Sequence, residues 1–345
     1  MTGPDSAPDS APNSTANSAA NSAAGIVVVS EDDCRKYISR EDAFVAVEAV
    51  FAAMARGDAY NFPVIREAIG HADALYGFKS GFDRAGLALG LKSGGYWPGN
   101  TERGLTNHQS TVFLFDPDTG QLKALVGGNY LTAVRTAAAS SVSIAHLARK
   151  DARVLGMIGA GHQAQFQLRA AAEQREFTQV LAWNAHPDML PALGEVAAEI
   201  GLPFEAVSRD ALGAQADVII SITSAKEALL MTDQVKPGTH IACMGTDTVG
   251  KQELDPALFA AATVFTDEIA QSTTLGEAQH AIAAGLIDAT DITPLGAVID
   301  GTHPGRSDSD EITLFDGTGV GLQDLAVADV AARLARDAGA PIVSL

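Results

Sequence analysis

The second half of the chain alternates short apolar runs with segments of helical length. Each run has four or five residues and is mostly apolar throughout, which is typical of strands buried on both faces. These runs lie at 154–158, 179–183, 218–222, 240–244 and 263–266. Strands that alternate with helices in this way predict a doubly wound α/β fold with a parallel sheet.

The first half of the chain has more strand-like runs and fewer helical segments. Strands are expected at 26–29, 64–68, 74–79, 87–93, 110–115 and 122–126, and helices at 40–56 and 132–148. The turn-forming residues Asp116-Pro-Asp-Thr-Gly120 lie between the last two strands and predict a hairpin. This half is therefore expected to be an α+β unit with a mixed sheet.

Composition divides the chain into a tail and two domains. Residues 1–25 repeat Ser, Ala, Asn, Pro and Asp, and this segment is predicted to be a disordered tail. The α+β domain is expected at 26–148 and the parallel α/β domain at 149–317. An amphipathic helix at 322–338, within a C-terminal segment 318–345, is expected to complete the first domain. The polar stretch 301–311 is expected to be a surface loop.

The turn after the strand at 154–158 has the spacing of a dinucleotide-binding motif. Gly159-Ala160-Gly161-His162-Gln163-Ala164 reads G-x-G-x-x-A. Gly159 permits a tight turn, Gly161 lets the backbone approach a pyrophosphate, and Ala164 lets the helix pack closely on the strand. The phosphates would lie at the helix N-terminus, where free N–H groups favour anions. The motif predicts a Rossmann-type domain, although an ordinary strand–helix turn can carry the same residues.

The end of the next strand bears on which dinucleotide is bound. An Arg at this position suits a 2′-phosphate and an acidic residue suits a free 2′-hydroxyl. The chain has Asn184 here, which can hydrogen-bond a hydroxyl but carries no positive charge. NAD(H) is therefore expected in preference to NADP(H), with the nearby His186 as the residue that argues for caution.

Charge and cysteine content limit the partners. The net charge is −19, which argues against nucleic acid or an anionic membrane as a partner. No apolar run approaches the roughly 20 residues needed to cross a bilayer. Two cysteines, Cys34 and Cys243, are too few for a disulfide framework, and they fit a reducing cytoplasm. The histidines show no zinc-ligand spacing, so no metal is expected.

Three cations in this acidic protein lie in apolar or small-residue surroundings. They are Arg66, Lys92 and Arg135. Each could form a structural ion pair, and a lysine can also extend its amine to solvent. Asp247 follows a strand of the parallel sheet, and ligands bind beyond the carboxyl ends of such strands. These four residues are candidates for a site that binds an anionic substrate.

Several long motifs together resemble the ornithine cyclodeaminase/mu-crystallin family, over nearly the whole chain after the tail. The matching segments are PVIRE around Arg66, the strand that holds Lys92, residues 107–140, VLGMIGAGHQAQ, ADVIISITS with Thr223, VKPGTHIACMGTDTVGKQEL around Asp247, and GTGVGLQDLAVA. The resemblance implies a substrate and dimerisation domain joined to an NAD-binding Rossmann domain. It also implies a homodimer that oxidises or reduces imino or amino acids at the α-carbon.

The family's functional residues transfer to this chain by position. Its carboxylate-binding arginines fall on Arg66 and Arg135, its active-site lysine on Lys92, and its acid/base aspartate on Asp247. Arginine suits a planar carboxylate because its guanidinium forms two parallel hydrogen bonds. Lys92 could donate a proton to the substrate or hydrogen-bond its carboxylate.

Family members differ in whether the reaction has a net redox change. Lys79 lies where a second substrate carboxylate would need a cation, which favours reduction of a dicarboxylic imine, although a solvated lysine is equally consistent with the position. His108 is a further polar candidate near the substrate. A cyclodeaminase, an alanine dehydrogenase and a ketimine reductase remain alternatives at this point.

Overall fold

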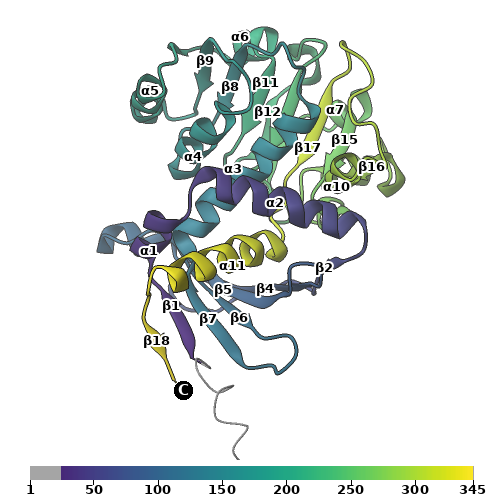
Figure 1. Ribbon diagram of the computed structural model, residues 1–345. Coiled ribbons are helices and arrows are strands. Elements are labelled where there is room, and N and C mark those ends of the chain that lie inside the picture. The colour runs from purple at the N-terminus through teal and green to yellow at the C-terminus, as the bar shows by residue number, and fades with distance from the viewer. Residues whose placement is uncertain (1–24, 345) are drawn as a thin grey trace, which may run out of the picture.

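Two eight-stranded sheets organise the part of the chain that the structure, a computed structural model, describes, residues 25–344 (Figure 1). In Figure 1 the parallel sheet lies at the top and the mixed sheet at the bottom, with α2, α3 and α11 between them. The predicted tail falls outside the described residues except for Gly25. Within residues 25–344, no helix combines the length and apolarity that a membrane-spanning segment needs.

The parallel sheet confirms the expected α/β fold. Its strands, in spatial order, are β10 (Phe204–Ala206), β9 (Gln179–Trp183), β8 (Val154–Ile158), β11 (Val218–Ser221), β13 (His240–Cys243), β17 (Thr313–Asp316), β15 (Thr263–Thr266) and β16 (Ile292–Pro294). Every neighbouring pair is parallel. The helices that connect these strands are α4 (His162–Ala171), α5 (Leu190–Glu199), α6 (Arg209–Gln215), α7 (Ala257–Ala261), α8 (Ile269–Ser272), α9 (Ala278–Ala283) and α10 (Leu295–Ile299). Two further strands, β12 (Lys226–Leu230) and β14 (Gln252–Leu254), form a small parallel sheet.

The strand β17 lies near the middle of this sheet and is absent from the sequence-based expectation. Only Leu314 and Phe315 in it are apolar, and polar residues occupy both its ends. Those polar ends can be buried because backbone and side-chain groups from distant segments form hydrogen bonds with them. Asp316 accepts hydrogen bonds from the backbone N–H groups of Glu277 and Ala278. A short strand whose polar ends are paired through remote contacts gives little apolar signal in the sequence.

The mixed sheet confirms the expected α+β part of the fold. Its strands, in spatial order, are β18 (Ile342–Val343), β1 (Ile26–Val29), β7 (Leu122–Gly127), β6 (His108–Phe115), β5 (Ala88–Tyr96), β4 (Leu75–Asp83) and β2 (Ala59–Asn61), and β3 (Ile65–Ala68) also pairs with β4. The β1–β7 pair is parallel and the other pairs are antiparallel. Strands β4 and β5 run further than expected, because glycines such as Gly81 and Gly94 interrupt the apolar pattern without ending the strand.

Four helices belong to the same half of the molecule: α1 (Glu31–Tyr37), α2 (Arg40–Ala55), α3 (Gly128–Leu147) and α11 (Gly321–Asp337). α3 begins four residues before the expected start. The carboxylate of Glu31 accepts hydrogen bonds from the backbone N–H groups of Asn129 and Tyr130, at 2.7 and 2.9 Å. This cap comes from α1 and is not visible in the local sequence.

The C-terminal helix α11 returns to the mixed sheet and closes its inner face. Leu322 lies over Gly81 and Leu325 over Gly90, where an added Cβ would come within about 3 Å of each leucine. The glycines therefore let the helix approach the sheet closely.

The stretch 301–311 is irregular, but it is not wholly a surface loop. Arg306 is half-buried and donates from Nε to the carbonyl of Leu147 at 2.7 Å and from Nη2 to Thr313 Oγ1 at 2.8 Å. This arginine ties the loop to the end of α3 and to β17, so part of the polar stretch is structural.

Candidate active site

A cavity of about 870 Å³ lies between the carboxyl ends of the parallel strands and the inner face of the mixed sheet. It contains most of the residues that the sequence singled out. They are Arg66, Lys79, Lys92, His108, Arg135, Gly161, His162, Gln163, Thr223 and Asp247. Four other candidates, Gly159, Ala160, Ala164 and Asn184, do not line it.

The glycine turn forms one end of the cavity. Gly159 has φ +111°, and a Cβ there would meet the carbonyl oxygen of Ile222 at 2.5 Å, so only glycine fits. Ala160 is buried behind the turn, and Ala164 is fully buried where α4 packs against the sheet. These residues shape the turn from behind the cavity wall.

The beginning of α4 presents unpaired groups to the cavity. Gly161 is the N-cap and supplies no side-chain cap, and a Cβ on it would find open space. The backbone N–H groups of His162 and Gln163 are in the first turn, where an α-helix provides no partner. Gln163 Oε1 is buried and has no hydrogen-bond partner among the described residues. Thr223 lines the same end, and its N–H donates to Glu253 Oε1 at 2.6 Å.

Asn184 does not line the cavity and lies in the loop that follows β9. It is beside the turn, and its Nδ2 donates to the carbonyl of His186 at 2.8 Å. The amide is therefore used within its own loop, and its expected contact with a ribose stays a prediction.

Three cations from adjacent strands occupy the other end of the cavity. Lys79 in β4 pairs directly with Lys92 in β5. Arg66 in β3 pairs with Gly77, two residues before Lys79, so all three side chains project from the same face of the sheet. Gly77 and Gly94 let the backbones of the neighbouring strands approach closely, since an added Cβ at either would lie within 2.3 Å of a backbone oxygen.

A buried carboxylate joins two of the candidate cations. Asp324 in the first turn of α11 is fully buried, and its Oδ1 accepts hydrogen bonds from Lys92 Nζ at 2.9 Å and from Arg135 Nε at 3.0 Å. Arg135 Nη1 also donates to Gln323 Oε1 at 3.0 Å. Asp324 Oδ2 is buried and has no partner in the described part of the chain. Arg135 thus uses two of its five N–H donors on α11, and three remain for a ligand.

Burial and neighbouring charges bring the pKa of the Lys92 amine close to neutral pH. Burial lowers the pKa of Lys92 to about 7, the charge of Asp324 opposes this shift, and Arg135 and Lys79 add to it. Burial also lowers the pKa of His108 to about 4, helped by Lys92, so this imidazole is neutral near pH 7. Burial alone would raise the pKa of Asp324, but Arg135 and Lys92 hold this pKa below its usual value.

Asp247 lies on the opposite wall and is an anion. Its Oδ1 accepts a hydrogen bond from Lys251 Nζ at 2.8 Å, and Arg66 Nη1 lies 3.4 Å from its Oδ2. Burial acts to raise the pKa of Asp247, but Lys251, Lys79 and Arg66 hold it well below its usual range. The carboxylate carries no proton that it could donate at neutral pH. Arg66 connects the two halves of the molecule, because its Nη1 also donates to Thr248 Oγ1 at 2.9 Å.

Comparison with known proteins agrees with this architecture. The family model for the ornithine cyclodeaminase/mu-crystallin family matches residues 27–337. The chain belongs to this family.

Two family members show how far the likeness extends. The iminosuccinate reductase of Paracoccus denitrificans (strain Pd 1222) is 64% identical over 314 residues, which are 91% of this chain and 98% of that enzyme. The crystal structure of that reductase in complex with NAD⁺ has a TM-score of 0.91 and covers 93% of this chain and 100% of its own, at 63% identity. A structure of an archaeal alanine dehydrogenase dimer with bound NAD has a TM-score of 0.88 at 29% identity, over 93% of this chain and 99% of its own.

Sequence reasoning missed several charged residues of the cavity region, namely Asp324, Lys251, Glu31 and Arg35. Asp324 lies in GTGVGLQDLAVA, on the face of α11 that also buries Leu325 and Ala328. An aspartate within an apolar helical stripe is the signal that could have identified it, because a buried carboxylate needs a partner. Lys251 lies four residues after Asp247 in a loop, and no periodic pattern points to it.

The pairing of Lys92 with Asp324 can be tested by changing Asp324 to Asn. The variant loses the negative charge that supports the protonated amine, so the pKa of Lys92 should fall below about 7. The loss of the partner of two buried cations should also destabilise the fold by about 3 to 5 kcal/mol. NMR titration of ¹³C-methylated lysines measures the pKa, and chemical denaturation measures the stability.

Asp329→Asn is the matched control. Asp329 is on the same helix, and its carboxylate accepts a hydrogen bond from the half-exposed Lys123 at 2.8 Å. This variant should leave the pKa of Lys92 unchanged and cost no more than about 1 kcal/mol. An unchanged or raised pKa of Lys92 in Asp324→Asn contradicts the assigned interaction.

Proposed function

We propose that this protein reduces iminosuccinate to L-aspartate by transferring a hydride from NADH to the carbon of the C=N bond. The observation that carries the proposal is the row of Arg66, Lys79 and Lys92 on one face of the mixed sheet, which matches a substrate with two carboxylates. The 64% identity to an iminosuccinate reductase, over nearly the full length of both chains, supports the same substrate.

The glycine turn is the binding site for NAD(H) in this proposal. The open space at Gly161 and the uncapped start of α4 fit a pyrophosphate, which would accept hydrogen bonds from the backbone N–H groups of His162 and Gln163. Two related structures contain NAD. Residues 149–317 would bind the dinucleotide, and residues 26–148 with 318–345 would bind the substrate. When bound, the reduced nicotinamide supplies the hydride.

Different cations would bind the two carboxylates of the substrate. Arg66 uses only Nη1 in hydrogen bonds within the described chain, so Nε and Nη2 can bind the α-carboxylate, with Nη2 of Arg135 as a further donor. Lys79 Nζ donates to the carbonyl of Gly319 at 2.6 Å and retains two protons for the β-carboxylate. The neutral His108 offers an additional polar contact beside them.

Proton transfer falls to Lys92 rather than to Asp247. An amine with a pKa of about 7 is partly protonated at neutral pH and can give its proton to the imine nitrogen, which makes the adjacent carbon a better hydride acceptor. Asp247 is ionised and would stabilise the positive charge that this step places on nitrogen. The reaction consumes one proton and one hydride and forms the amine of aspartate.

A cyclodeaminase is the main alternative within the family, and the geometry disfavours it. Such an enzyme binds a diamino acid and needs a carboxylate beside the distal ammonium. The residue in that direction is Lys79, which would repel it. An alanine dehydrogenase would leave Lys79 without a substrate partner.

The substrate is tested by following NADH absorbance with oxaloacetate plus ammonia, which supply iminosuccinate, beside pyruvate plus ammonia and glyoxylate plus ammonia. Ammonia-dependent oxidation of NADH with oxaloacetate, and formation of aspartate, is the expected result. Equal or faster reaction with pyruvate would make the protein an alanine dehydrogenase. Release of ammonia from ornithine without net change in NADH would make it a cyclodeaminase.

Lys79→Met sharpens this test, because it removes the charge and keeps most of the length of the side chain. The loss of a buried charge-assisted contact should lower kcat/KM for the dicarboxylic imine by a factor of roughly 30 or more, while activity with pyruvate and ammonia falls less. Lys123→Met is the control, since Lys123 lies on β7 away from the cavity and pairs with Asp329 of α11. Equal losses with both substrates would rule out a β-carboxylate contact for Lys79.

We further propose that the protein is a homodimer that assembles through the outer face of the mixed sheet. Opposite the cations, this face carries an aromatic cluster made of two groups of neighbouring rings, Tyr60 with Phe62 and Phe82, and Tyr76 with Phe78, which also borders the cavity. Tyr60 is 47% exposed and Phe78 is 37% exposed, and an apolar surface of this kind favours a protein partner. A related alanine dehydrogenase is a dimer.

The cytoplasm is the proposed location of the protein. Its two cysteines, Cys34 and Cys243, are free and buried, which fits a reducing compartment.

Light scattering after size-exclusion chromatography measures the assembly. The expected molar mass is twice the 35.6 kDa of the chain. Introducing charge with Tyr60→Glu and Phe78→Glu should give the mass of one chain, whereas Val249→Glu, at a position that is 75% exposed outside the cluster, should leave the dimer intact. A wild-type mass of one chain would refute the proposed dimer.

A further inference from the structure

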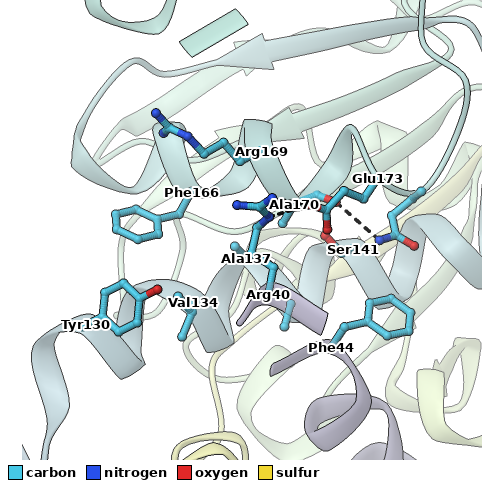
Figure 2. Close-up of a pocket in the computed structure, with 12 residues that line it drawn as sticks. Arg40, Phe44, Tyr130, Val134, Ala137, Ser141, Phe166, Arg169, Ala170 and Glu173 are labelled. Atoms are coloured by element: carbon cyan, nitrogen blue, oxygen red, sulfur yellow. Dashed lines mark hydrogen bonds and ion pairs between the residues drawn. The ribbon is translucent and has the colours of Figure 1, made fainter. Parts of the chain in front are cut away.

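A second cavity, of about 250 Å³, lies between α2, α3 and α4 and is separate from the proposed reaction site (Figure 2). Figure 2 shows the rings of Tyr130 and Phe166 on one side of it and Phe44 on the opposite side. Small residues such as Ala137 and Ala170 widen the space between the helices. The cavity therefore has flat aromatic walls and a mainly apolar lining.

One polar side chain in this cavity lacks a partner. Ser141 is 1% exposed, and its Oγ has no hydrogen-bond partner in the described part of the chain. Neighbouring serines of α3 do not share this property, because Ser140 Oγ donates to the carbonyl of Ala137 at 2.9 Å and Ser143 Oγ to that of Ser140 at 2.7 Å. A buried hydroxyl without a partner is unfavourable, so a ligand with one polar atom would gain a hydrogen bond here.

The charged residues at the edge of the cavity neutralise one another. Arg40 Nε donates to Glu173 Oε1 at 2.6 Å, and Arg169 Nη2 donates to Glu199 Oε2 at 2.5 Å. Each guanidinium already has a carboxylate partner. The cavity thus favours an uncharged ligand over an anion or a cation.

The cavity shares a wall with the site of the proposed reaction. Tyr130 and Phe166 line both spaces, and their ring centroids are 6.0 Å apart. The ring of His162, at the start of α4, lies 5.2 Å from that of Phe166. A ligand that fixes these two rings would also act on the first turn of α4.

We propose that this cavity is a regulatory site for a small, uncharged, planar aromatic molecule of the size of phenol or indole, which hydrogen-bonds Ser141 Oγ and changes the affinity for NADH. An apolar cavity of roughly 150 Å³ holds a benzene ring, so 250 Å³ accommodates one or two fused rings. The effect on NADH rests on the proposed function, whereas binding of the aromatic molecule does not. Coupling of this kind is reciprocal, so NADH would change the affinity for the aromatic ligand by the same factor.

Isothermal titration calorimetry with indole, phenol and benzoate tests the binding on the full chain without substrate. Indole and phenol should bind at submillimolar to millimolar concentration, and benzoate more weakly. Absence of binding by both neutral probes, or tighter binding of benzoate, overturns the proposal.

Two variants locate the probe. Ser141→Ala should weaken indole binding about fivefold, and its thermal midpoint should not fall, because no protein hydrogen bond is lost. Ala137→Leu fills the cavity and should abolish binding, whereas Val45→Leu, on the exposed face of α2, should not affect it. Indole affinity that is unchanged in both cavity variants places the probe elsewhere and refutes the site.

NADH fluorescence titration with and without saturating indole tests the regulatory part. A change of about fivefold in the dissociation constant for NADH, lost in Ala137→Leu, is expected. Binding of indole with an unchanged NADH affinity overturns the regulatory role. A protein that binds indole but no NADH refutes the proposed function instead.

Discussion

The buried carboxylate of Asp324 is the contact on which the substrate end of the cavity depends. It joins a lysine from β5, an arginine from α3 and the start of α11, three segments that are far apart in the chain. Without this anion, Lys92 and Arg135 would be two neighbouring buried cations that repel each other. Breaking such a cluster from one side is strongly destabilising, because the remaining charges stay buried without a partner. The return of the C-terminal helix to the first half of the fold therefore has a direct role in the site.

Other buried acids hold the loops around the cavity. Glu253 accepts hydrogen bonds from the backbone N–H groups of Thr223 and Gly245, the loops that follow β11 and β13. Asp267 does the same for Thr318 and Gly319, and the carbonyl of Gly319 in turn accepts a hydrogen bond from Lys79 Nζ. The chain has a net charge of −19, yet the surface that faces the proposed substrate is cationic. Glu253 and Asp267 therefore position the loops around the cavity and do not pair with its cations.

The sequence predicted the features that depend on local pattern, and it missed those that depend on remote contacts. The glycine turn and the strands of the parallel sheet follow from spacing and from continuous apolar runs. Lys92 and Arg135 were identified as cations in apolar surroundings, but their common partner Asp324 lies 232 and 189 residues away from them in the chain. The cap that Glu31 provides to α3 depends on a similar long-range contact. The lowered pKa of Asp247 could not be foreseen either, since burial alone would raise it and the cations that lower it come from three different segments.

A crystal structure of the protein with NAD⁺ and L-aspartate tests most directly whether the cation row binds a dicarboxylate. The β-carboxylate is expected within hydrogen-bond distance of Lys79 Nζ, the α-carboxylate at Arg66, and the amino group between Lys92 and Asp247. The α-carbon should face the nicotinamide ring. A β-carboxylate that points to solvent, with Lys79 still bonded only to the carbonyl of Gly319, would contradict this account of substrate recognition.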